Sequence, residues 1–258
     1  MPRFALASDG LHIAYESVGE GPPVLLLHGF ASSAEQNWRA TGWVRALAAA
    51  GLRAISFDFR GHGDSDKPHD PAMYGDKMLA DIFAVMAEAD APTAAVIGYS
   101  MGGVLGIRLL LHYPERVRRL VAAGVGEHYF SRPLHYRKIA DALQAPDNLR
   151  LADPLVRRFR AFATQKGKDR AALAACIRRE FPRLPQAALA AAKRPVLVVA
   201  GDADESAGAP EPLAAAFPDG RALRLPGRNH MTAVGDARYK RAATAFLKED
   251  YDSPSPSG

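Results

Sequence analysis

A serine stands at the centre of Gly98-Tyr99-Ser100-Met101-Gly102, between an apolar run at 93–97 and a helical pattern at 103–112. These flanking patterns place Ser100 on the turn between a predicted strand and a predicted helix. Such a turn is sharp enough to hold the hydroxyl away from the backbone, and it brings the two elements so close that both flanking glycines are needed. The helix also directs its free N–H groups toward Ser100. The pentapeptide therefore predicts a nucleophile.

A serine hydroxyl needs a base to accept its proton before it can attack a carbonyl carbon. His230 follows the predicted strand 221–225, and an imidazole can take and return a proton near neutral pH. The loop after the predicted strand 195–200 offers two carboxylates, Asp202 and Asp204, to orient that imidazole. Because loops at the carboxyl ends of parallel strands meet at one edge of a sheet, we expect these groups to converge there.

The segment Leu27-His28-Gly29-Phe30 supplies a further element of the same chemistry. Gly29 permits a tight turn after a buried strand, so that the backbone N–H of Phe30 can point inward. Together with the N–H of Met101 it would form an oxyanion hole with two donors. The side chains of Phe30 and Tyr99 are candidate substrate contacts, and His28 is interpreted as a support for the loop.

Eight apolar runs of strand length occur along the chain, mostly alternating with helical patterns. The runs are 4–7, 11–16, 24–27, 53–57, 93–97, 117–122, 195–200 and 221–225. The first two flank Ser8-Asp9-Gly10 and predict an antiparallel hairpin. The others predict βαβ units and a mainly parallel sheet, so the fold class is α/β.

The alternation stops at Gly124, and from 127 to 192 the periodicity is helical. We therefore expect a core formed by residues 1–125 and 195–249, with a helical cap inserted at 126–194. Residues 250–258 are polar and rich in proline, which predicts a disordered tail.

The chain resembles the α/β-hydrolase fold superfamily, and within it the capped, single-domain, esterase-like branch. The residues that carry the resemblance are His28-Gly29-Phe30, 58–65, 98–102, 201–204 and His230. The resemblance implies that Asp204 is the acid of a Ser-His-Asp catalytic triad, with Asp202 as the alternative, fallback acid. It also implies that the insertion is the cap. Haloalkane dehalogenases and epoxide hydrolases resemble the same scaffold but have aspartate where this chain has Ser100.

The function that follows is hydrolysis of a carboxylic ester through an acyl-enzyme intermediate, without a cofactor. The same triad would also serve a C–C bond hydrolase, a lactonase or a cofactor-free perhydrolase. A ligand receptor or signalling regulator on this scaffold is a further alternative. Arg228 and Asn229, immediately before His230, depart from the family pattern and indicate a polar approach to the site.

Composition limits the other classes of function. The chain has 258 residues, of which 48% are hydrophobic and 24% charged, as in ordinary globular domains. Its one cysteine, Cys176, excludes an internal disulfide and lies in an apolar helical stretch, which predicts a buried structural thiol. The histidines and carboxylates lack metal-ligand spacing, and no glycine-rich segment has a phosphate-binding pattern.

The net charge of +5 is unevenly distributed, because 126–194 contains 15 Lys and Arg against 6 Asp and Glu. Such a segment is either a solvated outer face or an attraction for anionic substrates. No nucleic-acid motif accompanies it, so we do not expect a nucleic acid as partner. The expected partner is a small-molecule ester or a related acyl substrate. The N-terminus lacks a secretory signal and no run is long enough to span a membrane, which predicts a cytoplasmic protein.

Overall fold

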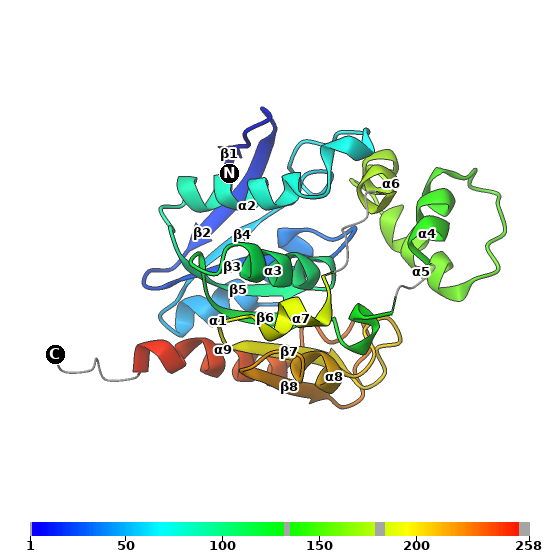
Figure 1. The fold of residues 1–258 in the computed structure, drawn as a ribbon. Coiled ribbons are helices and arrows are strands. Elements are labelled where there is room, and N and C mark those ends of the chain that lie inside the picture. Colours follow the sequence, from blue (N-terminus) through cyan, green and yellow to red (C-terminus); the bar gives the residue numbers. More distant parts are fainter. Residues whose placement is uncertain (1, 132–134, 179–183, 253–258) are drawn as a thin grey trace.

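A mixed sheet forms the centre of the computed structural model, which describes residues 2–131, 135–178 and 184–252 (Figure 1). The strands lie in the order β1-β2-β4-β3-β5-β6-β7-β8. Their bounds are β1 Arg3–Leu6, β2 His12–Val18, β3 Pro23–Leu27, β4 Arg53–Phe57, β5 Ala94–Tyr99, β6 Val117–Ala123, β7 Val196–Gly201 and β8 Gly220–Leu225. Strands β1 and β2 pair with their neighbours in antiparallel fashion, and the others are parallel. The predicted eight-stranded α/β fold with its N-terminal hairpin is confirmed.

Burial on both faces explains the composition of the central strands. Every residue of β5 and β7 is buried, and their side chains are apolar or aromatic apart from the glycines. The edge strand β8 instead exposes Arg221 and Arg224. Charged side chains on an edge strand discourage pairing with another chain.

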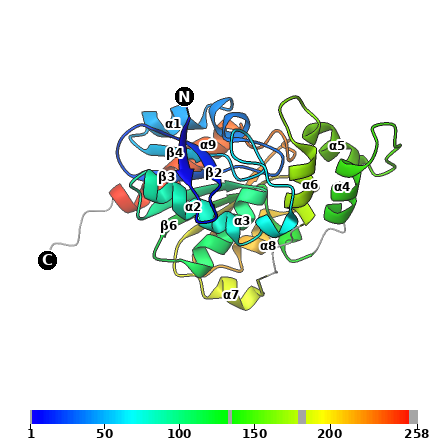
Figure 2. The ribbon, with the colours of Figure 1, turned by 90° about the horizontal axis from the view of Figure 1, so that it is seen from above.

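Helices cover both faces of the sheet (Figures 1 and 2). The core helices are α1 Trp43–Ala49, α2 Lys77–Glu88, α3 Met101–His112, α8 Pro210–Ala214 and α9 Ala237–Asp252. Side chains of α2, α3 and α8 belong to one buried cluster, and those of α1 and α9 belong to another. The sheet therefore separates two apolar layers.

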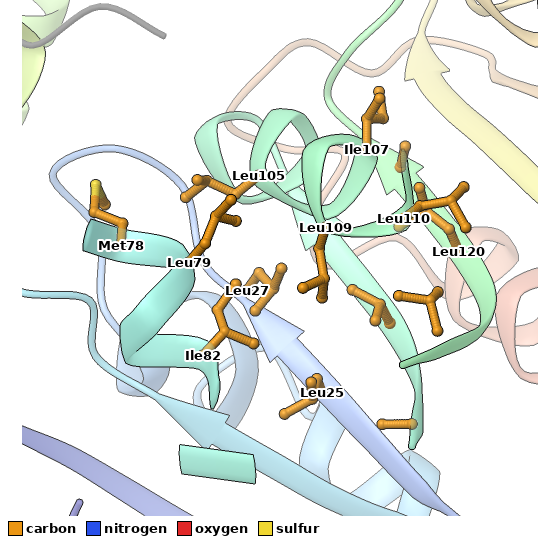
Figure 3. Packing of buried hydrophobic residues seen from close by; sticks show 14 of the residues in the cluster. Leu25, Leu27, Met78, Leu79, Ile82, Leu105, Ile107, Leu109, Leu110 and Leu120 are labelled. Atoms are coloured by element: carbon orange, nitrogen blue, oxygen red, sulfur yellow. The ribbon is translucent and has the colours of Figure 1, made fainter. Parts of the chain in front are cut away.

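The layer beneath α2 and α3 fixes the position of the serine turn. Figure 3 shows Ile82 of α2 and Leu105 and Leu109 of α3 beside Leu25 and Leu27 of β3. All five are fully buried. Burying one such side chain stabilises a fold by about 1.5–3 kcal/mol, so α3 is held firmly on the sheet.

The segment between β6 and β7 is helical, as the periodicity predicts. Its elements are η3 Glu127–Tyr129, α4 His135–Gln144, α5 Pro154–Ala163, α6 Arg170–Arg178 and α7 Gln186–Ala190. Helices α4, α5 and α6 lie to one side of the sheet (Figure 1). Ala175 and Cys176 of α6 and Leu189 of α7 join the core cluster beneath α2 and α3. The predicted cap 126–194 also includes 132–134 and 179–183, which lie outside the described residues.

The C-terminal helix corrects one boundary. The helical period of the sequence covers 236–248 and the polar composition predicts a tail from 250, but α9 continues to Asp252. Glu249 accounts for this extension, because its carboxylate pairs with Arg119 at 3.0 Å and with Arg221 at 2.7 Å. The rest of the predicted tail, 253–258, lies outside the described residues. The short elements η1 Glu35–Arg39, η2 Pro71–Met73 and α8 were not predicted, since so few residues show no clear period.

Candidate active site

Ser100 occupies the predicted turn between β5 and α3. Its backbone has φ 55° and ψ −113°, a conformation that residues other than glycine rarely adopt. A Cβ atom added to Gly98 would lie 2.2 Å from the carbonyl oxygen of Gly102, and one added to Gly102 would lie 2.0 Å from that of Leu27. Both glycines are therefore required by the close approach of β3, β5 and α3.

His230 and Asp204 meet Ser100 from two other loops. His230 Nε2 lies 2.9 Å from Ser100 Oγ, and His230 Nδ1 lies 2.8 Å from Asp204 Oδ2. Since an ionised carboxylate only accepts hydrogen bonds, Nδ1 carries the proton and Nε2 is free to accept one from the serine. The Asp204 carboxylate is fully buried, whereas 16% of the His230 side chain is exposed.

The environment keeps Asp204 ionised. Burial raises its pKa, but hydrogen bonds from His230 and from the backbone N–H groups of Ala207 and Ser206 hold that pKa below its usual value. A buried anion in this position stabilises a positive charge on the imidazole. This arrangement can move a proton from Ser100 to His230.

Asp202, the fallback acid, is not part of this arrangement. It is exposed, and its Oδ1 accepts a hydrogen bond of 2.8 Å from the backbone N–H of Gly227. That bond closes the turn after β8, which carries the chain toward His230. Asp202 therefore supports the loop, while Asp204 contacts the ring.

The loop after β3 passes close to Ser100. A Cβ atom added to Gly29 would lie 3.4 Å from Ser100 Cβ, and the Gly29 N–H donates to Asn37 Oδ1 over 2.8 Å. Phe30 is the next residue, and Met101 is the first residue of α3, where an N–H has no partner within the helix. The two backbone groups predicted as oxyanion donors therefore lie on segments adjacent to the serine.

Tyr99 has a specific contact that the sequence did not indicate. Its hydroxyl donates to the backbone carbonyl oxygen of His230 over 2.6 Å, and its ring centroid is 5.5 Å from that of the imidazole. Only 4% of Tyr99 is exposed. The hydroxyl thus joins the serine turn to the histidine loop, and a substrate contact by Tyr99 stays a prediction.

Two buried histidines lie beside the Phe30 loop. His28 Nδ1 donates to the carbonyl oxygen of Gly29, and its Nε2 accepts from the N–H of Phe59. The ring of His62 is 5.0 Å from that of His28 and 6.0 Å from that of Phe30. Burial lowers the pKa of His28 to about 4 and that of His62 to about 3, so both rings are neutral at neutral pH.

The structure also bears on metal binding, on membrane spans and on the single cysteine. Within 2–131, 135–178 and 184–252, no group of three His, Cys, Asp or Glu side chains could hold a metal ion. Among those same residues, no helix is both long and apolar enough to cross a membrane. Cys176 is buried, and burial raises the pKa of its thiol to about 12.

A family profile described as the alpha/beta hydrolase fold matches residues 22–156, just over half of the chain. The chain belongs to the alpha/beta hydrolase fold family. The match spans the loop after β3, the serine turn and the beginning of the helical insertion, so the predicted resemblance to the α/β-hydrolase fold superfamily is confirmed.

The chain is only 25–34% identical to the individual proteins that follow. Over 120 residues this alpha/beta hydrolase is 34% identical to bifunctional epoxide hydrolase 2 of Sus scrofa; the match covers 46% of the chain but only 21% of that protein. A hydrolase of Pseudomonas aeruginosa is 26% identical, with a TM-score of 0.70 over 98% of both chains. A meta-cleavage product hydrolase variant is 25% identical, with a TM-score of 0.70 over 96% of this chain and 98% of the other.

Sequence reasoning missed the residues that hold the loops in place. Asn37 lies in a segment without clear periodicity, and nothing nearby marks its side chain as the acceptor for Gly29 N–H. Asp58, the first residue of the motif 58–65, accepts from Asp64 N–H in the turn that follows it. It also accepts from the N–H of Ala34 over 2.7 Å and so ties the two loops together, a long-range contact that the sequence does not reveal.

Proposed function

We propose that this alpha/beta hydrolase cleaves carboxylic esters through a covalent acyl-enzyme intermediate. The observation that carries the proposal is the hydrogen-bonded chain Ser100–His230–Asp204, with distances of 2.9 and 2.8 Å. A hydroxyl, an imidazole and a buried carboxylate in this order form the relay by which serine hydrolases activate their nucleophile.

In the first half of the reaction, Ser100 Oγ attacks the acyl carbon and transfers its proton to His230 Nε2. Asp204 stabilises the resulting imidazolium and keeps the ring oriented. The N–H groups of Phe30 and Met101 donate to the oxyanion of the tetrahedral intermediate. Each such donor typically stabilises the transition state by about 3–4 kcal/mol. His230 then protonates the departing alcohol.

In the second half, water attacks the ester of Ser100 with His230 as the base. Collapse of the second tetrahedral intermediate releases the acid and returns the proton to Ser100. The helical segment 126–194 acts as the cap that shapes the acyl site. Support comes from Phe159 of α5, whose ring centroid is 6.3 Å from that of Phe30 on the oxyanion loop.

The nucleophile is tested by labelling the protein with a fluorophosphonate and mapping the modified peptide. We expect the label on Ser100, and we expect Ser100→Ala to lose both labelling and hydrolysis of para-nitrophenyl acetate while it unfolds cooperatively like the wild type. Hydrolysis at the wild-type rate by a folded Ser100→Ala variant would contradict the proposal.

A C–C bond hydrolase is the second candidate, and the likeness to a meta-cleavage product hydrolase favours it. The same serine would attack a ketone carbon, and the bond broken would join two carbon atoms. A panel of para-nitrophenyl esters and vinylogous diketones distinguishes the two. Turnover of the diketones with negligible turnover of the esters would replace the ester proposal.

A further inference from the structure

Lys168 lies on the segment that joins α5 to α6, and this segment contacts the loops around the proposed oxyanion hole. Gln36 Nε2 donates to Gln165 Oε1 over 3.3 Å, one residue before Asn37, the side chain that holds Gly29. On the other side of Lys168, Asp169 Oδ2 lies 2.9 Å from His69 Nε2. Lys168 is thus held between two contacts of the insertion with the core.

The ammonium group of Lys168 has only neutral partners. Its Nζ donates to the carbonyl oxygen of Phe162 and to Gln165 Oε1, both at 3.1 Å, and lies 3.4 Å from the centroid of the Phe162 ring. An ammonium has three N–H donors, so one of them has no oxygen or nitrogen acceptor among the residues that the structure describes and has only the face of the Phe162 ring nearby. Nor does any carboxylate of those residues lie within 4.0 Å of Nζ.

Arg157 of α5 donates to the backbone carbonyl oxygens of Leu151 and Ala152, but four other arginines of the neighbouring helices contrast with this lysine, because each has an acidic partner. The pairs are Arg158 with Glu205, Arg160 and Arg170 with Asp147, and Arg178 with Asp141. Lys168 is half-buried, and burial lowers its pKa to about 8. Taking a charge out of water without a counter-ion costs free energy, which a bound anion would offset.

The position of Lys168 relates it to the reaction. Phe162, which its ammonium covers, packs with Phe30 and Phe159 against one apolar cluster that includes Ala31 of the oxyanion loop. The positive charge of Lys168 adds to the effect of burial in lowering the pKa of His28 and of His62. The ammonium therefore lies on the side of the insertion that faces the oxyanion loop.

We propose that Lys168 binds a carboxylate of the substrate, so that the preferred substrates are esters with a carboxylate several bonds from the scissile carbonyl. This inference rests on the proposed ester hydrolysis. One N–H donor that lacks an oxygen or nitrogen acceptor suits a carboxylate, whereas a phosphate is usually held by several donors. The carboxylate could belong to the acid or to the alcohol part of the ester.

Two pairs of esters test the proposal and separate these two sources. The first pair is the mono-para-nitrophenyl ester of adipic acid and its neutral analogue with an isopropyl group in place of the carboxylate. The second pair is para-acetoxyphenylacetic acid and its neutral isobutyl analogue. In at least one pair, we expect wild-type kcat/KM to be higher for the charged ester than for its neutral analogue. We expect Lys168→Gln to lower the ratio of these two kcat/KM values by roughly tenfold, which corresponds to the loss of one hydrogen bond to a charged group.

Lys166→Gln is the matched control, because Lys166 lies on the same segment but is exposed. It should keep the wild-type ratio, and Lys168→Arg should restore most of it. Titration of adipate into Ser100→Ala, with and without Lys168→Gln, measures binding independently of turnover. If Lys168→Gln lowers kcat/KM equally for both members of each pair, Lys168 only positions the insertion and the inference is wrong. Ser100-dependent hydrolysis of the neutral esters would then leave the proposed function intact.

Discussion

Asp202 and Asp204 are two residues apart, yet only Asp204 contacts the imidazole of His230. Asp204→Asn would leave a neutral partner that favours the wrong tautomer of the ring, so we expect kcat to fall by roughly a thousandfold or more. Asp202→Asn keeps an oxygen that can accept from Gly227 N–H and should retain most of the activity. Steady-state kinetics on one ester compare the two variants, and equal losses would show that Asp204 is not the acid.

The hydroxyl of Tyr99 allows a test of whether a single hydrogen bond positions the loop that carries His230. Tyr99→Phe removes the donor to the His230 carbonyl oxygen, which should lower the free energy of unfolding by about 1 kcal/mol and kcat by up to about tenfold. Tyr239→Phe is the matched control, since its buried hydroxyl has no hydrogen-bond partner among the described residues. Thermal unfolding and kinetics should separate the variants. A Tyr99→Phe variant as active as Tyr239→Phe would exclude this positioning role.

The difference between predicted and unpredicted residues has a physical cause. Ser100, Asp204 and His230 each follow a strand in the sequence, so the topology of a parallel sheet is enough to bring them together. The bonds from Asn37 to Gly29, from Tyr99 to His230 and from Asp58 to Ala34 depend on the exact path of loops. No periodicity encodes that path, and only coordinates reveal such contacts.

At the scale of elements, α3 provides two glycines with opposite expected behaviour. A Cβ on Gly102 would lie 2.0 Å from the backbone oxygen of Leu27, which cannot move without disrupting β3. A Cβ on Gly106 would lie 2.8 Å from Leu120 Cδ1, the flexible end of a side chain. We expect Gly102→Ala to be inactive and unstable, and Gly106→Ala to fold, since alanine favours the helix by about 1 kcal/mol. Far-ultraviolet circular dichroism during heating compares the stability of the two variants, and hydrolysis of para-nitrophenyl acetate compares their activity.

Some elements of this fold can be predicted from the sequence more readily than others. Strands β5 and β7 are buried on both faces, so their apolar runs stand out from the surrounding chain. The last turn of α9 depends on ion pairs between Glu249 and two arginines from other elements, and polar residues at 250–252 gave the opposite signal. Tertiary contacts therefore decide the boundaries that local composition leaves open.

Over the whole molecule, the insertion is attached to the core at the loops that carry the proposed chemistry. Gln165 and Phe159 contact the segment around Phe30, and Arg158 pairs with Glu205, the residue after Asp204. Any movement of the insertion would therefore reach the oxyanion loop and the acid loop together. A substrate held by Lys168 would bind to the insertion and the core at once, so we expect it to strengthen their association.

The stability of the whole molecule should depend on pH through His28 and His62. Their pKa values are lowered by burial to about 4 and about 3, compared with 6.5 for a free histidine, so these residues bind more protons in the unfolded chain than in the folded one between about pH 3 and 6.5. The free energy of unfolding therefore rises with pH from about 3 to 6.5. Each proton contributes up to about 1.4 kcal/mol per pH unit.

Urea unfolding at closely spaced pH values measures this slope directly. Asp204 and Asp169 have pKa values below the usual range, so their contribution to the slope lies at lower pH than that of the histidines. Burial raises the pKa of Asp81, which opposes the slope, so the contribution of the histidines is isolated by substitution. His62→Gln removes one of the two buried rings and should reduce the slope by up to about 1.4 kcal/mol per pH unit, with the full reduction near pH 5. An unchanged slope in that variant would mean that His62 is protonated in the folded protein, and its burial beside His28 would then need another explanation.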